Sequence, residues 1–358
     1  MKKLDLYIIK KFLGTFVYAL LLIIIIVIVF DVSEKIDDFI EKDAPLHAII
    51  FDYYLNFIPY FANLFSALFT FISVIFFTSK LTSDSEIIAI LSSGISFKRL
   101  LRPYIISAII LTIFSFILIN WIIPPANQKR LEFEEVFIKN RFRNKDKNIH
   151  KQILPETFIY LDSYNNLYDI GYKFSMEKFE NGKLKSKLIS DYAQWDTTIN
   201  KWKIVNYIIR DFDEGKETIT NGRRIDTTIN MFPKDFTRRV NVVEAMNYKQ
   251  LDNFIAAETM VGSSNVTLWK IEKHKRFAYP FSTIILTLIG VCISSRKTRG
   301  GIGLNIGIGI FLAFTYIMFM QVSTVLATNA NMNPFLAVWI PNITYGIIAI
   351  GLYFKAAK

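Results

Sequence analysis

Residues 80–103 read KLTSDSEIIAILSSGISFKRLLRP, a short polar stretch between two long apolar segments. Its first half contains Ser83-Asp84-Ser85-Glu86, which has the S-x-x-E form of a capping box and predicts the start of a helix. Asp84 and Glu86 are expected in the first turn of that helix, where carboxylates favour the positive end of the helix dipole. One apolar face then follows, and Ser92-Ser93-Gly94 is expected to end the helix after about two turns; the face consists of Ile87, Ile88 and Leu91.

Such a short helix is unstable alone in water, so it must lie against another surface. The pattern leaves two interpretations open. The helix is either an ordinary connector at the membrane surface or a docking helix for a cytoplasmic partner.

The composition indicates a membrane protein with a sizeable water-soluble part. Hydrophobic residues make up 52% of the 358 residues, and charged residues make up 20%. The single cysteine, Cys292, lies in an apolar stretch, so there is no disulfide framework and the redox compartment cannot be inferred. The formal net charge of +11 is compatible with nucleic-acid binding, and the placement of the charges must decide.

Six apolar stretches are long enough to span a membrane, and we expect the first to be an uncleaved helix behind an amphipathic lead-in at residues 1–11. Asn56, Pro59 and Asn63 interrupt the second stretch and predict a kink near Pro59. The six are Phe12–Phe30, Ile49–Phe77, Tyr104–Ile123, Phe277–Ser294, Ile302–Leu326 and Phe335–Phe354.

The segment between the third and fourth spans has a different character. A polar helix is expected at 126–138, followed by a charged loop at 139–151. Short alternating stretches then predict strands of a small sandwich or jelly roll: Thr157–Asp162, Leu167–Ser175, Leu184–Trp195 and Trp202–Phe212. The expected turns are Asn165-Asn166, Asn181-Gly182, Asp213-Glu214-Gly215 and Asn221-Gly222.

After these strands, Asn247 is expected to cap a helix through Glu258, and Gly262 to end it. The predicted fold is therefore α+β, with six transmembrane helices and an inserted jelly-roll-like domain. The predicted divisions are 1–125, 126–265 and 266–358.

The short loops give the orientation, because basic residues concentrate on one side and cytoplasmic loops carry an excess of lysine and arginine. This places both termini in the cytoplasm and the β-rich insert on the opposite side. Basic and acidic residues nearly balance in the insert, so a nucleic-acid role is not expected. The basic residues are Lys2, Lys3, Lys10, Lys11, Lys80, Lys98, Arg99, Arg102, Arg296, Lys297, Arg299, Lys355 and Lys358.

The sequence lacks the motifs of an energy-coupled enzyme. It contains no P-loop, HExxH or GxSxG pattern, and the span centres contain no charged residue of the kind that ion-coupled transporters use. Any uphill transport therefore needs energy from another subunit. Polar groups in the spans can hydrogen-bond between helices, and Gly303, Gly307 and Gly309 favour close helix packing; the polar groups are Asn63, Asn120, Asn305 and Gln321.

The chain resembles the LptF/LptG (YjgP/YjgQ) family of lipopolysaccharide-export permeases over essentially its full length. The resemblance is carried by the sequence of 83–103 and by three further motifs in this order: WIIPPAN at 121–127, KRFAYP at 275–280 and WIPN at 339–342. It implies six spans, a periplasmic β-jelly-roll, and two permeases paired around a lipid cavity above a cytoplasmic ABC ATPase dimer, which binds ATP and Mg. This chain is then a non-catalytic subunit of the bacterial inner membrane and binds no cofactor itself.

The resemblance also implies site residues. The family's docking helix maps onto Ser83–Gly94, with Glu86 as its acidic residue. Lipopolysaccharide passes to periplasmic jelly-roll proteins of the LptC/LptA type. G-type members carry extra lysines at the outer end of the first span, whereas only Lys35 is basic here, so Lys35 is the candidate lipid-phosphate contact.

A different class of function remains as an alternative. A membrane-anchored envelope sensor would also combine membrane spans with a periplasmic ligand-binding β domain. A sensor normally carries a cytoplasmic output domain, and the cytoplasmic segments expected here are too short for one.

Overall fold

The computed structural model describes residues 3–138, 147–213, 216–233, 236, 240–260, 262–263, 265–296, 301–330 and 332–356. The chain divides into two compact units. The helical unit contains Met1–Lys139, Glu244–Leu251 and Thr267–Lys358, and the β unit contains Asn140–Val243 and Asp252–Val266. Most of the charged loop predicted at 139–151 lies outside the described residues, as do Lys2, Lys297, Arg299 and Lys358 among the basic residues.

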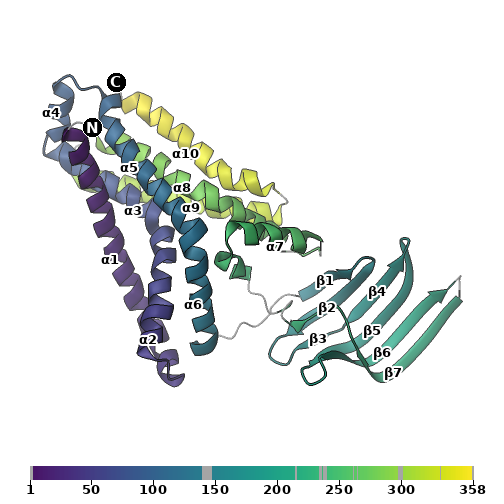
Figure 1. The fold of residues 1–358 in the computed structure, drawn as a ribbon. Coiled ribbons are helices and arrows are strands. Elements are labelled where there is room, and N and C mark those ends of the chain that lie inside the picture. Colours follow the sequence, from purple (N-terminus) through teal and green to yellow (C-terminus); the bar gives the residue numbers. More distant parts are fainter. Residues whose placement is uncertain are drawn as a thin grey trace. The chain divides into compact units, whose positions relative to one another are not determined.

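Within the described residues, six helical segments are long and apolar enough to cross a membrane, which confirms the predicted number (Figure 1). Short π-helical turns join some helices into longer segments. They keep the backbone hydrogen-bonded from one helix to the next, as a segment that crosses lipid requires. The bounds are α1 (Lys3–Glu41), α2 (Leu46–Ala48), η1 (Ile49–Tyr54), α3 (Leu55–Ser83), α4 (Glu86–Ser92), α5 (Phe97–Ile117), η2 (Leu118–Ile122), α6 (Ile123–Phe137), α8 (Val266–Ser294), α9 (Gly301–Asn329) and α10 (Pro334–Ala356).

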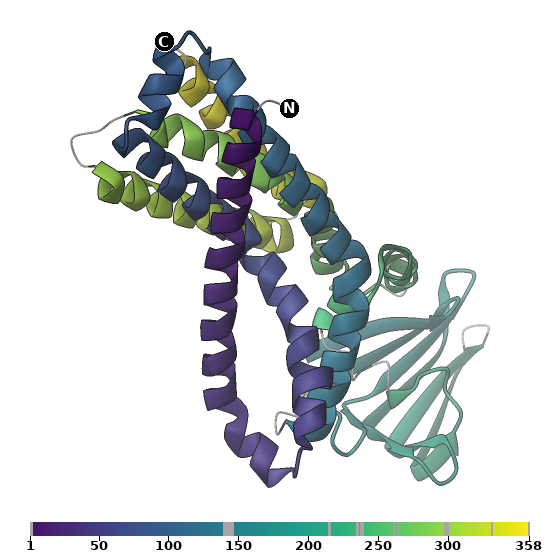
Figure 2. The same ribbon diagram turned by 60° about the vertical axis from the view of Figure 1, so that its left-hand side comes forward.

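Two helices extend well beyond the predicted spans. The first span was predicted to end at Phe30, but α1 continues through the acidic residues that follow to Glu41. The third segment runs from Phe97 to Phe137. Side-chain packing explains the extensions, since Phe39 of α1 and Phe133 of α6 are both buried, with ring centroids 5.9 Å apart. In Figure 2, α1 is one long helix.

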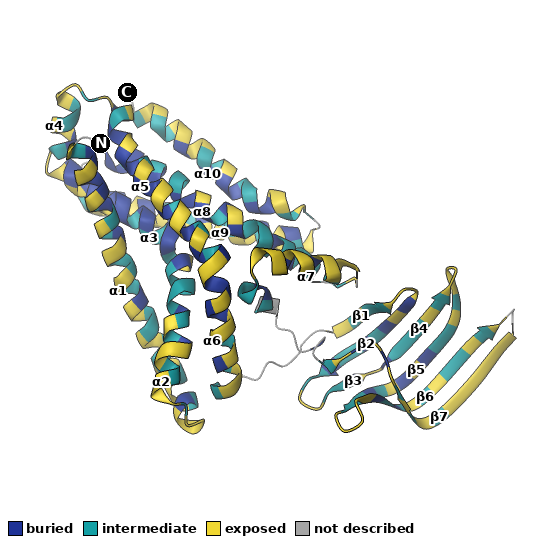
Figure 3. Ribbon diagram, viewed as in Figure 1, coloured by how far each residue is buried: buried dark blue, intermediate teal, exposed yellow. Residues whose placement is uncertain are grey.

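The core of the helical unit lies around α3 and α8. In the most apolar 18-residue stretch of α8, 61% of the residues are buried. In the corresponding stretch of α1, only 17% are buried (Figure 3). Asn63 accepts a hydrogen bond from Ser115 (2.7 Å), and Asn305 donates one to Ser79 (3.0 Å), so these predicted contacts between helices are confirmed. Asn120 instead bonds to the Phe116 carbonyl in its own segment.

The predicted glycine packing face on α9 is confirmed at one of its three glycines, Gly309. A Cβ on Gly309 would clash with Ile75 Cδ1 of α3, so the two helices approach closely there. A Cβ on Gly303 or Gly307 would meet nothing within 4 Å. Among the described residues, these two glycines therefore do not pack against another helix.

The β unit contains a sheet of seven antiparallel strands with the order β1-β2-β3-β5-β6-β7, in which β4 also pairs with β2 and β5. One apolar cluster is built around the fully buried Trp202, whose indole Nε1 donates to the Met231 carbonyl (2.8 Å). The bounds are β1 (Lys147–Leu154), β2 (Thr157–Asn165), β3 (Ile170–Tyr172), β4 (Ser175–Glu180), β5 (Lys183–Asp196), β6 (Lys201–Asp213) and β7 (Lys216–Thr227).

The six spans and the inserted β-sheet domain confirm the predicted fold class, but two local predictions were wrong. The expected strand at 167–175 is divided, because β3 ends at Tyr172 and β4 begins at Ser175. Asn221-Gly222 is not a turn but lies within β7, where Gly222 pairs with Tyr207. A Cβ on Gly222 would lie 2.7 Å from the Tyr207 hydroxyl, so the glycine makes room for that side chain.

The predicted turn at Asn181-Gly182 is confirmed by positive φ angles of 52° and 75°. Of the turn at 213–215, Glu214 and Gly215 lie outside the described residues.

The helix after the sheet is capped as predicted. The Asn247 side chain accepts from the Gln250 N–H and the Gln250 side chain accepts from the Asn247 N–H, both at 2.9 Å. The helix α7 (Tyr248–Met260) follows, and Gly262, at φ 74°, ends it.

Candidate functional site

The helix α4 begins later than its sequence predicts. Ser83 is the last residue of α3, Asp84 lies in the turn, and Ser85 precedes α4 at φ 63° without a capping side-chain bond. The predicted capping box is therefore wrong. The last turn of α3 is held because the buried Thr82 hydroxyl donates to the Ser294 carbonyl of α8 (2.7 Å). The predicted end is confirmed, since α4 stops at Ser92 and Gly94 has φ 84°.

The apolar residues of α4 do not all face outward. Ile87 is fully buried in a core that includes Phe12 and Leu81, and Leu91 is half-buried against the same core. Ile88 remains 43% exposed, beside exposed Ala89 and Ser92. The exposed surface of α4 is therefore centred on Ile88, whereas the Ile87 side chain packs inside the helical unit.

The charged residues around α4 are tied to α1. Glu86 Oε2 accepts a hydrogen bond from the Tyr7 hydroxyl (2.9 Å). Arg99 donates to both Asp5 carboxylate oxygens (2.7 and 2.8 Å) near the start of α5, where Ser96 accepts from the Arg99 N–H. Figures 1 and 2 place both ends of the described chain at the same end of the helical unit as α4.

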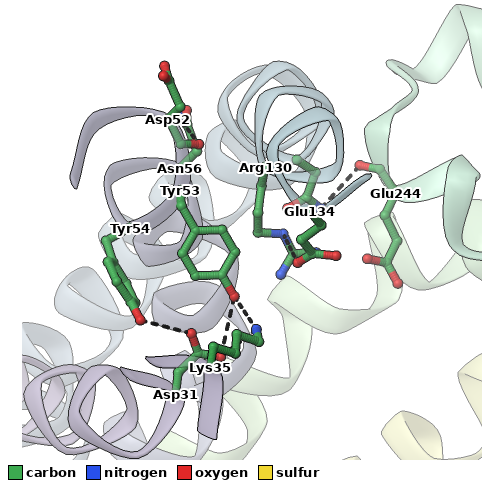
Figure 4. Close-up of polar contacts among 10 residues, drawn as sticks. Asp31, Lys35, Asp52, Tyr53, Tyr54, Asn56, Arg130, Glu134 and Glu244 are labelled. Carbon is green, nitrogen blue, oxygen red and sulfur yellow. Dashed lines mark hydrogen bonds and ion pairs between the residues drawn. The ribbon is translucent and has the colours of Figure 1, made fainter. Parts of the chain in front are cut away.

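At the far end of α1, Lys35 is already engaged within the chain (Figure 4). Its ammonium pairs with Asp31 (2.7 Å) and donates to the Tyr53 hydroxyl. The Tyr53 and Tyr54 hydroxyls donate to the same carboxylate at 3.3 and 3.2 Å. A lipid phosphate at Lys35 would therefore have to compete with Asp31.

A cavity of about 580 Å³ lies inside the helical unit, between α3, α8 and α9. Its walls are mainly apolar, with charged residues that sequence reasoning had not assigned to any site. The residues that line the cavity include Tyr60, Asn63, Leu64, Phe65, Leu68, Ile119, Ile123, Glu244, Glu272, Lys275, Arg276, Tyr279, Ala313, Tyr316, Ile317, Met320 and Gln321.

The charged residues of the cavity belong to a partly buried cluster. Arg276 Nη1 donates to the Met246 carbonyl (2.8 Å), and Asn127 Nδ2 to the Glu244 carbonyl (3.5 Å). Arg130, 8% exposed, pairs with Glu134 (3.8 Å; Figure 4). Its guanidinium also lies over the Tyr60 ring. The segment that returns from the β unit is thus fastened to α6 and α8.

Burial raises the pKa of Glu244 to about 7, and the neighbouring Glu272 carboxylate acts in the same direction. The Arg130 guanidinium opposes this shift without cancelling it. Near neutral pH the Glu244 carboxyl is therefore partly protonated, in a cluster that also contains Glu134 and Arg276.

We expect Glu244→Gln to flatten the pH dependence of stability. Between pH 4.5, the ordinary pKa, and about 7, the folded state holds a proton that the unfolded state has released. The Glu244 contribution is therefore greatest at acidic pH and is lost as the pH rises through the folded pKa. Thermal unfolding midpoints in detergent at about pH 5.5 and pH 8 should fall more in the wild type than in Glu244→Gln.

Glu135→Gln, at an exposed position of α6, is the matched control and should keep the wild-type fall. An equal fall of the unfolding midpoint in the wild type and in Glu244→Gln would contradict the raised pKa of Glu244.

Comparison with known proteins decides between the two functional classes. The family model for the lipopolysaccharide export system permease LptF/LptG matches residues 6–355. The chain belongs to this family. No curated protein matches the chain.

Membership of the LptF/LptG family makes the chain a non-catalytic, multi-pass permease subunit of the lipopolysaccharide export system. It favours export over the envelope sensor. It also implies that the chain works within an Lpt complex.

Sequence reasoning located α4 but missed the charged cluster. The only local signal was the four-residue spacing of Glu272 and Arg276, which places both on one face of α8. Glu244 gives no comparable signal, because the α6 residues Arg130 and Glu134 are more than 100 positions away in the sequence.

Proposed function

We propose that this LptF/LptG permease extracts lipopolysaccharide from the outer leaflet of the bacterial inner membrane and passes it to a periplasmic bridge. The family match over residues 6–355 carries the proposal. In this account a cytoplasmic ABC ATPase dimer docks at α4 and binds ATP and Mg²⁺. This chain contributes the surface at Ile88 and Glu86, flanked by Asp84 and the exposed Ser83.

The cavity supports an amphiphilic substrate. Its aromatic and aliphatic walls suit acyl chains. Its charged lining pairs the cations Lys275 and Arg276 with Glu244 and Glu272, and the two cations could also meet phosphate groups. We propose Lys275 as a phosphate contact in addition to Lys35, whose ammonium is shared with Asp31.

A second LptF/LptG-type permease is proposed to complete the lipid cavity. The uncovered apolar surface of α1 supports this, because such a surface must face lipid or another helix.

The orientation is tested by cysteine labelling in a Cys292→Ser background. Lys183→Cys, exposed in the β unit, should react with a membrane-impermeant thiol reagent in intact cells whose outer membrane is permeabilised. Ser93→Cys, exposed beyond α4, should not react until the inner membrane is opened. The inside-positive charge distribution is the physical reason.

A cysteine at Ser295, just after α8, could not report the orientation, because Ser295 is 6% exposed and would be silent on either side of the membrane. Labelling of Ser93→Cys but not of Lys183→Cys in intact cells would invert the topology.

The β unit is proposed to pass lipid to a jelly-roll partner of the LptC/LptA type through an edge strand. The segments 157–162 and 202–212 lie in β2 and β6, which have strand neighbours on both sides. Among the described strands, β1 and β7 each have a single neighbour, so their edges are open to another chain.

A photo-crosslinker at Ile219 of β7, 61% exposed, should therefore capture a periplasmic partner. The same crosslinker at the buried Ile204 of β6 should not. Equal capture at both positions would contradict an edge contact.

A further inference from the structure

The start of α1 is joined to α4 and α5 by two polar contacts of different character. The Asp5–Arg99 ion pair is bidentate, and the Asp5 side chain is only 7% exposed. Breaking this pair would take the bidentate guanidinium away from a buried carboxylate, so the pair should persist through conformational changes. The single bond from the Tyr7 hydroxyl to Glu86 is exposed (2.9 Å), so it is the weaker of the two contacts.

Apolar packing joins the same elements. Ile87 of α4 is fully buried in one cluster with Ile8 and Phe12 of α1. The Phe12 ring also stacks on Phe77 of α3, with centroids 5.5 Å apart. Close-packed side chains transmit displacement because they leave no free space between them. A shift of α4 therefore displaces the start of α1.

Beyond Phe16, α1 is largely uncovered until its far end. Ile24 and Phe39 are its only other buried residues within the described chain. Near Phe39, α1 is attached again, through Asp31 and Lys35 to Tyr53 and through Phe39 to Phe133. An unbroken helix of 39 residues is about 58 Å long, so α1 connects the α4 end of the helical unit to η1 and α6.

We propose that α1 is the strut that carries movement of α4 to the far end of the helical unit, with Asp5 and Tyr7 as positioning residues. This rests on the proposed ATPase docking at α4. The Asp5–Arg99 pair is the stronger joint, and the Tyr7–Glu86 bond is a second, weaker joint that ties Glu86 of α4 directly to α1.

The test uses the purified complex with its ATPase, reconstituted in liposomes that contain lipopolysaccharide. Tyr7→Phe removes only the hydroxyl, and Asp5→Asn removes the charge at nearly unchanged volume. Both variants should retain the ATPase and its basal hydrolysis, while lipopolysaccharide released per ATP falls by about fivefold or more. The reversed pair Asp5→Arg with Arg99→Asp should recover part of the loss in Asp5→Asn.

A distance measurement keeps the test independent of stability. Spin labels at Val29 of α1 and Ile113 of α5, both exposed, report movement of the far half of α1 in a Cys292→Ser background. A non-hydrolysable ATP analogue should shift this distance in the complex and shift it less in Tyr7→Phe.

Wild-type release per ATP and a wild-type distance shift in Tyr7→Phe and Asp5→Asn would overturn the strut. Failure of the ATPase to bind even the unmodified chain would instead refute the docking at α4, and the strut with it.

Discussion

Ile88→Asp should separate the ATPase from the permease while leaving the permease folded. Ile88 is 43% exposed on α4, so aspartate there meets water in the isolated chain. At a docked interface the change loses the burial of an isoleucine and forces a carboxylate against apolar groups. A cost of about 3 kcal/mol weakens binding roughly a hundredfold. Co-purification of the ATPase in mild detergent measures the effect.

Two variants serve as controls for this result. Ile40→Asp, at a 70% exposed position on the far end of α1, should retain the ATPase. Ile87→Asp should lower the yield of folded protein, because Ile87 is fully buried. Normal ATPase yield with Ile88→Asp would reduce α4 to a surface connector. Glu86→Ala should have a smaller effect on folding than on coupling, since the one hydrogen bond that the carboxylate makes to the described residues is exposed.

Trp202→Ala should unfold the β unit selectively. The Trp202 side chain is fully buried, contacts the Trp195 ring at 5.3 Å between centroids, and donates to the Met231 carbonyl. Truncating a buried tryptophan costs about 3–5 kcal/mol, a large fraction of the stability of a small domain. Limited proteolysis of the full chain should show rapid cleavage within 147–227 while the helical segments survive.

Tyr168→Ala is the matched control, because its aromatic side chain is 67% exposed. It should be cleaved at the wild-type rate. Equal resistance of Trp202→Ala and the wild type would mean that Trp202 does not hold the sheet together.

The spans and strands were predictable because their patterns are local. Long apolar stretches fixed the six crossings, and the alternation around Trp202 predicted β5 and β6. Predictions failed where a distant partner decided the outcome. Ser83 stays in α3 because Thr82 bonds to Ser294, more than 200 residues away, and Asn221-Gly222 stays in a strand because Tyr207 lies across it.

The candidate site was predictable only in part for the same reason. Sequence located α4 and its acidic residue, but not that Ile87 faces inward or that Lys35 is paired. The cavity assembles side chains from distant helices and the return segment at Glu244, so no local pattern indicated it.

ATP-dependent lipid release shows whether this permease exports lipopolysaccharide. The complex purified through this chain is reconstituted in liposomes that contain lipopolysaccharide, and transfer to a soluble jelly-roll acceptor is followed with and without ATP. If the ATPase docked at α4 drives export, transfer should require ATP, and it should be lost with Ile88→Asp but not with Ile40→Asp. If the intact complex hydrolysed ATP but released no more lipopolysaccharide than it does without ATP, ATP-driven export by this permease would be contradicted.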